Sequence, residues 1–326
     1  MKVSINIPTY NQDKLITKAV ESALNQSYHN IEVNVGDDST NDLTKIVLSK
    51  YCSRPNFNYV KNEVNIGRVK NYHKLLYEVS TGDWALNLDG DDYLIDEHFI
   101  EDAVNKIKSN SDLVMICARH KSKTPDGVLT WVKTKYDKTD KDFFIFDGFK
   151  EFLPQAFEIR SGHLTSLYNR ELAMRIGFYE HDIITADSES VLRLVLHGKV
   201  GFINRFVGIW CQHELNASQQ SNINEFILAF QRNDLVYDHG LSLNLPSKEL
   251  SKWKKMMDFR HALRLFGRIV YQNQIEFLDD FIKIVKERKI SKLKLFFSPE
   301  MIFKTTRLFL IHPGKAKKIV QIFLPI

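Results

Sequence analysis

Three aspartates crowd one short segment of the chain. Asp89, Asp91 and Asp92 follow an apolar run at residues 84–88, and Gly90 separates the first two. Ionised carboxylates this close repel one another, so their charge must be offset by a cation or by several hydrogen-bond donors. Carboxylate oxygens suit Mg²⁺ and Mn²⁺, which leave positions free for a phosphate. The alternative is an acidic surface turn, in which Gly90 supplies the bend and the aspartates cap the next helix.

Two earlier segments also end in polar residues. Residues 3–11 (VSINIPTYN) predict a buried strand that ends at a proline and a polar turn, and residues 31–35 predict a second strand that leads to Asp37 and Asp38. In an open parallel α/β sheet, ligands bind beyond the carboxyl ends of the strands. We therefore expect both tips to converge with segment 89–92 on a single crevice.

Helical segments alternate with these strands. Apolar residues recur at helical spacing over 15–24 and 43–47, and again over 69–79 after a predicted strand at 57–60. Strands that alternate with helices predict an α/β fold.

Six motifs occur in a defined order. They are residues 3–11 (VSINIPTYN), 25–28 (NQSY), 37–42 (DDSTND), 65–71 (NIGRVKN), 88–92 (LDGDD) and 186–193 (ADSESVLR). Their order and spacing resemble those of the family 2 glycosyltransferases, a large inverting group with the GT-A nucleotide-sugar-binding fold. The resemblance covers about the first 215 residues.

The chain departs from the family pattern in two places. Gly36 precedes the Asp pair and Ser39 follows it, where the family commonly has glycine after the pair, and Ala186 replaces the first acid of a later acidic pair. These departures favour the alternative of a catalytically silent nucleotide- or glycan-binding partner subunit. The retained aspartates favour an active enzyme.

Two domains are expected, the first from the resemblance and the second from the positive charge and helical spacing of the C-terminal residues. An α/β domain with a Rossmann-like mixed sheet flanked by helices is expected over residues 1–218, where it would bind the nucleotide sugar and perform catalysis. A basic, mainly α-helical region is expected over 219–326, for acceptor, membrane-surface or oligomer contacts.

The resemblance also implies a donor site. Pro8, Thr9 and Tyr10 form a platform for the base, and Asp38 accepts a hydrogen bond from the imide N–H of the base, which favours uracil and hence a UDP-sugar. Without the resemblance, Tyr10 would be an ordinary strand-end aromatic residue and Asp38 a helix N-cap. The implied nucleotide-sugar-binding residues are Pro8, Thr9, Tyr10, Asn11, Asp38, Asn65, Gly67, Arg68, Asp89 and Gly90.

A Mn²⁺ or Mg²⁺ cofactor is implied as well. Asp91 ligates the cation directly, Asp89 lies near the ribose and the metal, and His213 completes the coordination or contacts the diphosphate. Imidazole suits Mn²⁺ better than Mg²⁺. The alternatives are a structural role for His213 and a helix cap for Asp92.

A general base is expected at the start of a predicted helix after residue 185. In the family the Asp of an acidic pair is the base, so Asp187 is the best match and Glu189 the reserve. No second carboxylate suggests a nucleophile, so we expect direct displacement at the sugar C1. Residues 161–163 are candidates for the acceptor pocket, with no role fixed by the sequence.

Composition agrees with an intracellular enzyme. The 326 residues, 44% of them hydrophobic, suffice for one large core with a smaller attachment. We find no signal peptide and no apolar run of about 20 residues that would span a bilayer. Cys52, Cys117 and Cys211 have no CxxC spacing, which predicts reduced thiols in a cytoplasmic protein and argues against zinc.

Positive charge concentrates at the C-terminus. Residues 251–326 contain 17 Lys and Arg against 6 Asp and Glu, a net charge of +11, whereas the rest of the chain has a net charge of −6. Within 291–326, cations alternate with large apolar residues, which fits an amphipathic helix on an anionic membrane surface. The alternative is a helical cap that packs on the catalytic domain. No motif accompanies the charge that would indicate nucleic acid binding.

The tail suggests a peripheral position at the inner face of the cell membrane. The expected acceptor is then a glycan or lipid-linked glycan in the assembly of a surface polysaccharide. The sequence leaves the donor sugar and a homo-oligomeric state open. A phosphohydrolase with an Asp-x-Asp nucleophile is disfavoured, because Tyr93 stands at the fifth position and the motif is not in the first strand.

Overall fold

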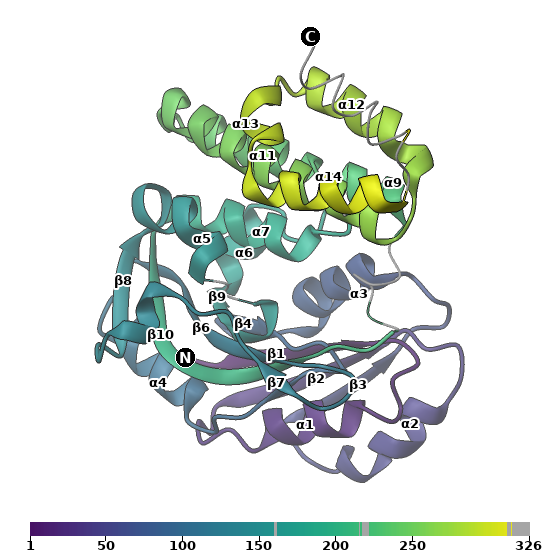
Figure 1. The fold of residues 1–326 in the computed structure, drawn as a ribbon. Helices are drawn as coiled ribbons and strands as arrows, with labels where there is room; N and C mark the ends of the chain where they lie inside the picture. The colour runs from purple at the N-terminus through teal and green to yellow at the C-terminus, as the bar shows by residue number, and fades with distance from the viewer. Residues whose placement is uncertain (160–161, 215, 217–221, 312–313, 315–326) are drawn as a thin grey trace. The chain divides into compact units, whose positions relative to one another are not determined.

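The computed structural model describes residues 1–159, 162–214, 216, 222–311 and 314, which form two compact units. The first unit comprises Met1–Asp182 and Ala186–Gln219, and the second comprises Ile183–Thr185 and Gln220–Ile326. The predicted α/β sheet with flanking helices and a helical C-terminal region is confirmed (Figure 1). The assignment of separate functions to residues 1–218 and 219–326 stays a prediction.

The first unit is built on one mixed sheet. Among the described residues the strands run in the order β3-β2-β1-β4-β9-β6-β10-β5, with β7 paired to β6 and β8 to β10. Strands β3, β2, β1 and β4 are parallel, and β9 runs antiparallel to β4 and β6. The strands are β1 Val3–Thr9, β2 Ile31–Asp37, β3 Phe57–Lys61, β4 Trp84–Asn87, β5 Tyr93–Leu94, β6 Leu113–Lys123, β7 Leu129–Thr130, β8 Phe143–Asp147, β9 Ser166–Asn169 and β10 Lys199–Cys211.

Helices cover both faces of this sheet. In Figure 1, α1, α2 and α4 lie on one face, and α3, α5, α6 and α7 lie on the other. The α-helices of this unit are α1 Ile16–Leu24, α2 Leu43–Leu48, α3 Arg68–Lys74, α4 Phe99–Lys108, α5 Leu153–Ile159, α6 Arg170–Arg175 and α7 Ala186–Leu194. Shorter turns are the 3-10 helices Ser49–Tyr51, Lys135–Lys138, His163–Thr165 and Val195–His197 and the π-turns Leu75–Val79 and Gly148–Phe152.

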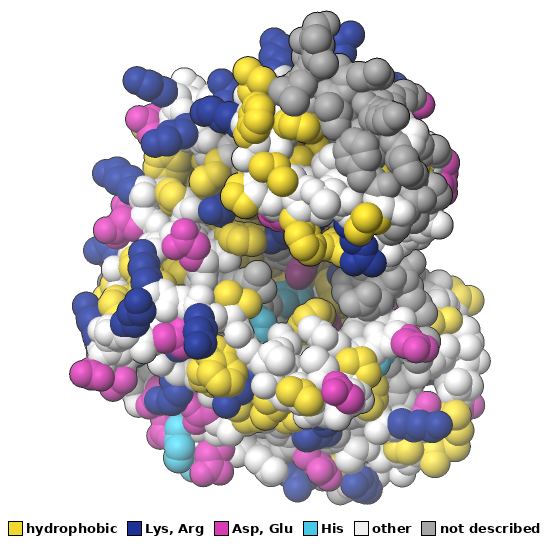
Figure 2. Space-filling view, in the orientation of Figure 1, with side chains coloured by type: hydrophobic (Ala, Val, Ile, Leu, Met, Phe, Trp, Pro, Cys, Tyr) yellow, Lys and Arg dark blue, Asp and Glu magenta, His cyan; other side chains and the backbone are white. Residues whose placement is uncertain are grey.

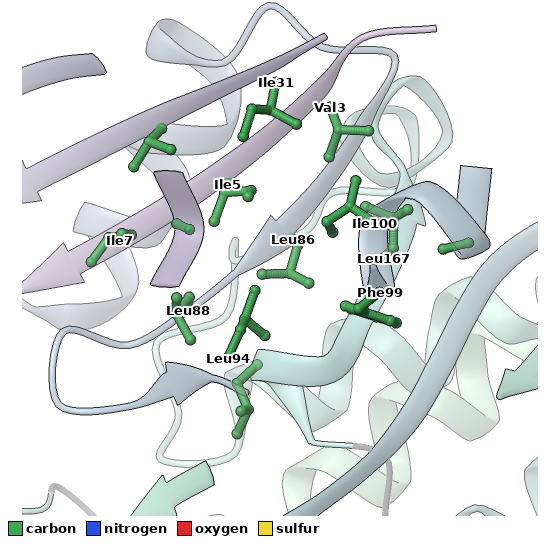
Figure 3. Packing of buried hydrophobic residues seen from close by; sticks show 14 of the residues in the cluster. Val3, Ile5, Ile7, Ile31, Leu86, Leu88, Leu94, Phe99, Ile100 and Leu167 are labelled. Atoms are coloured by element: carbon green, nitrogen blue, oxygen red, sulfur yellow. The ribbon is translucent and has the colours of Figure 1, made fainter. Parts of the chain in front are cut away.

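Strands β1 and β2 lie within the core of this unit. Every residue of β1 and β2 is buried, as expected for parallel strands that are covered on both faces. Figure 3 shows Ile5 of β1, Leu86 of β4 and Phe99 of α4 among the side chains of this core. Burial of such a side chain stabilises the fold by about 1.5–3 kcal/mol.

A row of amides fixes the register of three strands. Asn58 Nδ2 donates to Asn34 Oδ1 at 2.8 Å, and Asn34 Nδ2 donates to Asn6 Oδ1 at 3.1 Å. Asn6 and Asn34 are buried and Asn58 is exposed on the edge strand β3, so this row links three neighbouring strands. In the resulting register, Thr9 lies beside Asp37, and Asp37 beside Lys61, so the strand tips are level with one another.

The second unit is helical. Its helices are α9 Ile223–Leu228, α10 Gln231–Ser242, α11 Ser247–Tyr271, α12 Leu278–Glu287, α13 Lys292–Phe296 and α14 Pro299–Ile311, with a 3-10 turn at Ile275–Phe277. Its core includes Phe266 and Phe281, whose ring centroids lie 5.3 Å apart. A buried polar contact joins α10 to α11, where Asn233 donates to Asp258 at 2.7 Å. In the described part of the chain, no helix combines the length and the apolar character needed to cross a bilayer.

Candidate functional site

The three aspartates lie together just after β4. Asp89, Asp91 and Asp92 each offer a carboxylate oxygen within 4.8 Å of the others. Asp92 is buried, and its carboxylate accepts a hydrogen bond from the Cys211 backbone N–H at 2.8 Å. The suggested helix cap for Asp92 is therefore wrong, because α4 begins at Phe99 and Asp92 instead ties the end of β10 to the cluster.

The electrostatics of the cluster favour a bound cation. Burial, and then the Asp91 carboxylate, raise the pKa of Asp89, and the same two causes raise the pKa of Asp92. Tyr72 Oη opposes this shift at Asp89, because it donates a hydrogen bond to Asp89 Oδ1 at 2.9 Å. Closely spaced carboxylate oxygens are the ligands that Mg²⁺ and Mn²⁺ prefer, so the residues present fit the implied cofactor.

Two further side chains reach the same aspartate from the segment after β10. His213 Nε2 lies 2.7 Å from Asp91 Oδ2, and Asn216 Nδ2 donates to the same oxygen at 3.1 Å. Asn216 Nδ2 also contacts the Cys211 carbonyl at 3.1 Å. The sequence assigned a role to His213 and none to Asn216, although Asn216 follows it by three residues in the His-x-x-Asn-x-Ser pattern of residues 213–218.

The tip of β1 packs closely against the aspartate turn. The Gly90 N–H donates to the Pro8 carbonyl at 3.1 Å. A Cβ atom at Gly90 would lie 2.6 Å from Gln12 Oε1 and 2.9 Å from Thr9 Oγ1, so a larger residue there would displace these side chains. Tyr10, which follows Thr9 at the tip of β1, is 48% exposed. Gly90 thus joins the two segments, and Tyr10 presents an open aromatic face.

The departure at Ser39 has a local structural role. Asn11 adopts a positive φ of 53°, and its N–H donates to Ser39 Oγ at 2.8 Å. The Ser39 N–H in turn donates to Asp37 Oδ1 at 2.9 Å. The side chain of Ser39 therefore links the tips of β1 and β2. A glycine at this position would have no side chain to make this link.

Gly36 is required by helix packing. A Cβ atom there would lie 2.6 Å from Asn71 Oδ1 and 2.9 Å from the Leu75 side chain. Because Gly36 has no side chain, the Asn71 side chain fits beside it, and Asn71 Nδ2 donates to the Gly36 carbonyl at 2.8 Å. The glycine before the Asp pair thus lets α3 approach β2.

Asp38 organises the loop before α3. Its buried carboxylate accepts hydrogen bonds from the N–H groups of Ile66 and Gly67, both at 2.9 Å, and from Asn62 Nδ2 at 3.0 Å. An ionised carboxylate offers about four lone-pair sites, so about one remains for a ligand. The helix N-cap alternative is wrong, because Asp42 precedes α2 and Asp38 binds the 62–67 loop.

The loop at 62–67 also positions Arg68, the first residue of α3, near the aspartate cluster. The Gly67 N–H donates to Asn65 Oδ1 at 2.9 Å, and Gly67 has a φ of 90°, which favours glycine. Arg68 opens α3 as predicted, and its guanidinium lies 5.4 Å from the centroid of the Tyr72 ring. Burial alone would lower the pKa of Arg68, but Tyr72 and the carboxylates of Asp187 and Asp89 raise it. These charges therefore lie within one electrostatic environment.

Asp187 lies in the first turn of α7, as predicted. The reserve residue, Glu189, is fully buried and pairs with Arg193. The Arg193 guanidinium also donates to the Gly177 carbonyl at 2.7 Å, so the pair anchors α7 to the preceding loop. Glu189 is therefore a structural group, and Asp187 is left as the acid of α7 that acts electrostatically on Asp89.

An aromatic cluster borders these charges. The Tyr72 ring packs against His163 and Tyr179, with centroids 5.4 and 5.3 Å away. His163 Nε2 lies 2.5 Å from Tyr179 Oη, and burial lowers the pKa of His163 to about 4, so its ring is neutral near pH 7. The structure thus brings His163 to the site, whereas Ser161 lies outside the described residues.

Comparison with known proteins gives a family match. The model described as "Glycosyl transferase family 2" matches residues 4–175. A hyaluronan synthase of Pasteurella multocida is 24% identical over 294 residues, and a poly(ribitol-phosphate) β-N-acetylglucosaminyltransferase, TarS, of Staphylococcus aureus is 30% identical over 118 residues. These matches cover 88% and 36% of this chain but 28% and 21% of the relatives, so the chain spans about a quarter of their length.

Solved structures share the fold. S. aureus TarS 1–349 in complex with UDP-GlcNAc superposes with a TM-score of 0.71 at 19% identity, over 96% of this chain and 92% of that chain. The mannosyltransferase PcManGT of Pyrobaculum calidifontis, in complex with GDP-Man and Mn²⁺, gives a TM-score of 0.52 at 13% identity, over 99% of this chain and 87% of that chain. The predicted GT-A architecture is confirmed by this likeness.

Proposed function

Since this chain belongs to glycosyl transferase family 2, we propose that it transfers a sugar from a nucleotide diphosphate sugar to a hydroxyl group of a glycan or lipid-linked glycan, with inversion. The observation that supports this most directly is the cluster at the end of β4. There Asp89 and Asp91 lie with His213 beside the tip of β1. The rival phosphohydrolase is wrong, because the family match covers the Asp-x-Asp segment.

The cofactor in this proposal is Mn²⁺ or Mg²⁺. Asp91, Asp89 and His213 would hold it, and Asn216 would orient Asp91. When bound, the cation neutralises charge that develops on the departing diphosphate. Arg68 contributes a fixed positive charge close to Asp89.

Asp187 is the general base in this proposal. Its carboxylate takes the proton from the acceptor hydroxyl as that oxygen attacks the sugar C1 from the side opposite the leaving group. The bond from C1 to the nucleotide diphosphate breaks in the same step, so the anomeric configuration inverts. The ion pair of Glu189 with Arg193 supports this role, because it holds the helix that presents Asp187.

The proposed donor is a UDP-sugar. Tyr10 is exposed beside Pro8 and Thr9, where a base can stack, and Asp38 retains about one acceptor site for an imide N–H. Among the similar structures, TarS binds UDP-GlcNAc and UDP, whereas PcManGT binds GDP-Man. The imide N–H of uracil can donate to a carboxylate, and TarS, which gives the higher TM-score of the two, is the one solved with UDP, so we favour UDP over GDP and dTDP.

Calorimetric titration tests this donor site. We expect UDP to bind the full chain more tightly than GDP or dTDP, and to bind more tightly with Mn²⁺ than without it. A panel of UDP-sugars would then identify the donor by release of UDP. If no nucleotide binds, the donor site is not functional, and the catalytically silent partner subunit becomes the better description.

The membrane position is proposed from the C-terminal helices. Apolar side chains gather on the surface of α13 and α14 (Figure 2), while Leu295, Met301 and Leu308 are buried in the core of the helical unit. These helices therefore have an inner apolar face that packs and outer apolar residues that are free for lipid. We propose a cytoplasmic enzyme, peripheral at the inner membrane face. The exposed residues are Leu293 (60%), Phe297 (59%), Ile302 (48%), Phe303 (64%) and Leu310 (83%).

A vesicle flotation assay tests the membrane position. We expect the wild type to float with vesicles that contain phosphatidylglycerol, and we expect the triple variant Leu293→Ser, Phe297→Ser, Phe303→Ser to stay in the soluble fraction. These side chains are exposed, so the variant keeps the buried residues of α13 and α14. Ile46→Ser, at a residue of α2 that is 64% exposed, is the control. Equal flotation of the triple variant and the wild type would contradict the proposal.

A further inference from the structure

Strand β6 presents a row of cations on one face. Arg119, Lys121 and Lys123 alternate with other residues, and side chains two apart in a strand point to the same face. The Arg119 guanidinium lies 4.1 Å from the centroid of the Phe206 ring on β10, and Lys121 Nζ lies 5.1 Å from the same centroid. Arg119 and Lys121 therefore lie over an aromatic floor.

Trp131 extends this floor beyond β7. Its ring meets Phe206 edge-on at a centroid distance of 6.0 Å, and Lys121 Nζ lies 5.6 Å from its centroid. Trp131 is nevertheless 47% exposed. A rigid aromatic side chain with an open face offers a surface on which the C–H face of a sugar ring can stack. We call Arg119, Lys121, Lys123, Trp131 and Phe206 the β6 strip.

The segment that carries the strip is rich in cations. Residues 119–135 contain five Lys and Arg and one acid, Asp126. Arg119 is paired with Asp137 at 2.6 Å, and Asp126 accepts a hydrogen bond from Thr124. Lys121 and Lys123 are partly exposed, and neither takes part in an ion pair among the residues that the structure describes. An anionic ligand complements this surface, and a neutral one does not.

The strip is continuous with the aspartate site. In the pairing of β6 with β10, Lys123 lies opposite Cys211, and the Gln212 N–H donates to the Lys123 carbonyl at 2.8 Å. The Cys211 backbone N–H donates a hydrogen bond to the Asp92 carboxylate, and the His213 ring contacts the Asp91 carboxylate. From this point Lys121 and Arg119 recede along the strand, for a length of about 13 Å at 3.3 Å per residue. The strip therefore begins at the proposed metal ligands and leads away from them.

We propose that the β6 strip binds an anionic stretch of the acceptor glycan, with Lys121 and Lys123 on its carboxylate or phosphate groups and Trp131 stacked on a sugar ring. This inference rests on the proposed function and names the acceptor class, a chain of acidic sugars or sugar phosphates. A bound chain would run along β6 with its growing end at the aspartate site. Neutral glycans would be poor acceptors.

Polymer binding tests the strip without any turnover. The full chain is titrated with hyaluronan oligosaccharides, which carry carboxylates, with poly(ribitol phosphate), and with neutral dextran. We expect the wild type to bind one or both anionic polymers and not dextran. Trp131→Ala and the double variant Lys121→Ala, Lys123→Ala should each weaken this binding by at least about tenfold, the equivalent of a lost stacking or charged contact.

Matched variants separate the strip from general charge and from folding. Lys45→Ala with Lys108→Ala removes the same charge at exposed sites on α2 and α4 and should leave binding unchanged. Trp131→Tyr keeps an aromatic face and should restore most of the affinity lost in Trp131→Ala. Equal weakening by the control pair, equal binding of dextran, or binding only to anionic vesicles would overturn the inference.

Donor titration distinguishes the two proposals. Strip variants should bind UDP like the wild type and should raise KM for an anionic polymeric acceptor with little change in kcat. If the wild type does not bind UDP, the proposed function is contradicted, and polymer binding at the strip stands as a separate result. Normal UDP binding without strip-dependent polymer binding would contradict the strip alone.

Discussion

Asp187→Asn is expected to lower glycosyl transfer by about 10² to 10⁴, because the amide cannot accept the proton of the attacking hydroxyl. The substitution is isosteric, and Asp187 lies in the first turn of α7, whose anchor is the separate pair of Glu189 and Arg193. We therefore expect UDP binding to persist. The measurement is initial rate of UDP release with donor and acceptor, beside calorimetric titration of the same preparation.

The control for this result is Glu171→Gln, at an exposed residue of α6 that loses the same charge. It should retain wild-type transfer. If Asp187→Asn keeps more than about a tenth of the wild-type rate, the base lies elsewhere. Glu189→Gln is unsuitable as a comparison for catalysis, because it breaks a buried ion pair and would destabilise the fold.

Asp91→Ala is expected to abolish the effect of Mn²⁺ on UDP binding and to reduce transfer to background. Asp91 is the aspartate that both His213 and Asn216 contact, so its loss removes the proposed direct ligand and the group around which two other side chains are arranged. Electron paramagnetic resonance of free Mn²⁺ measures the metal affinity. Calorimetry with UDP, with and without Mn²⁺, measures the coupling.

Two comparisons make this prediction specific to the metal. Removal of Asp91 takes one charge out of a crowded carboxylate cluster, so the thermal midpoint of the metal-free protein should stay near that of the wild type. Asn216→Ala should weaken Mn²⁺ binding by about 10- to 100-fold, since Asn216 acts through Asp91. Unchanged Mn²⁺ affinity in Asp91→Ala would show that this aspartate is not a ligand.

Much of the architecture follows from local patterns in the chain. The strand at 3–11 was predicted and is observed as β1 Val3–Thr9, and Arg68 opens α3 as expected. A helix was predicted after residue 185, and α7 Ala186–Leu194 is observed there. Such features depend on the spacing of apolar residues and on the turn and polar residues at the ends of strands and helices, and these signals extend over only a few residues.

Other parts of the site depend on contacts between distant segments. Asp38 was assigned to base recognition, yet most of its hydrogen-bonding capacity is used by the loop at 62–67. Tyr72 had no assigned role, and its hydroxyl, on α3, donates a hydrogen bond to Asp89, which follows β4. Residue type alone does not specify which of several donors a carboxylate meets, because packing of whole elements determines that choice.

The sequence by itself determined the α/β class, the polar strand tips and the acids that could serve as ligands and base, because each is encoded within a short segment. The tertiary structure decided which of these groups meet. His213 and Asp91 lie 122 residues apart in the chain and 2.7 Å apart in space, since β10 is a long strand whose end is tied to Asp92. The pairing of β6 with β10 likewise brings Lys123 beside that end. Long-range strand pairing, which no local pattern specifies, therefore assembles the site.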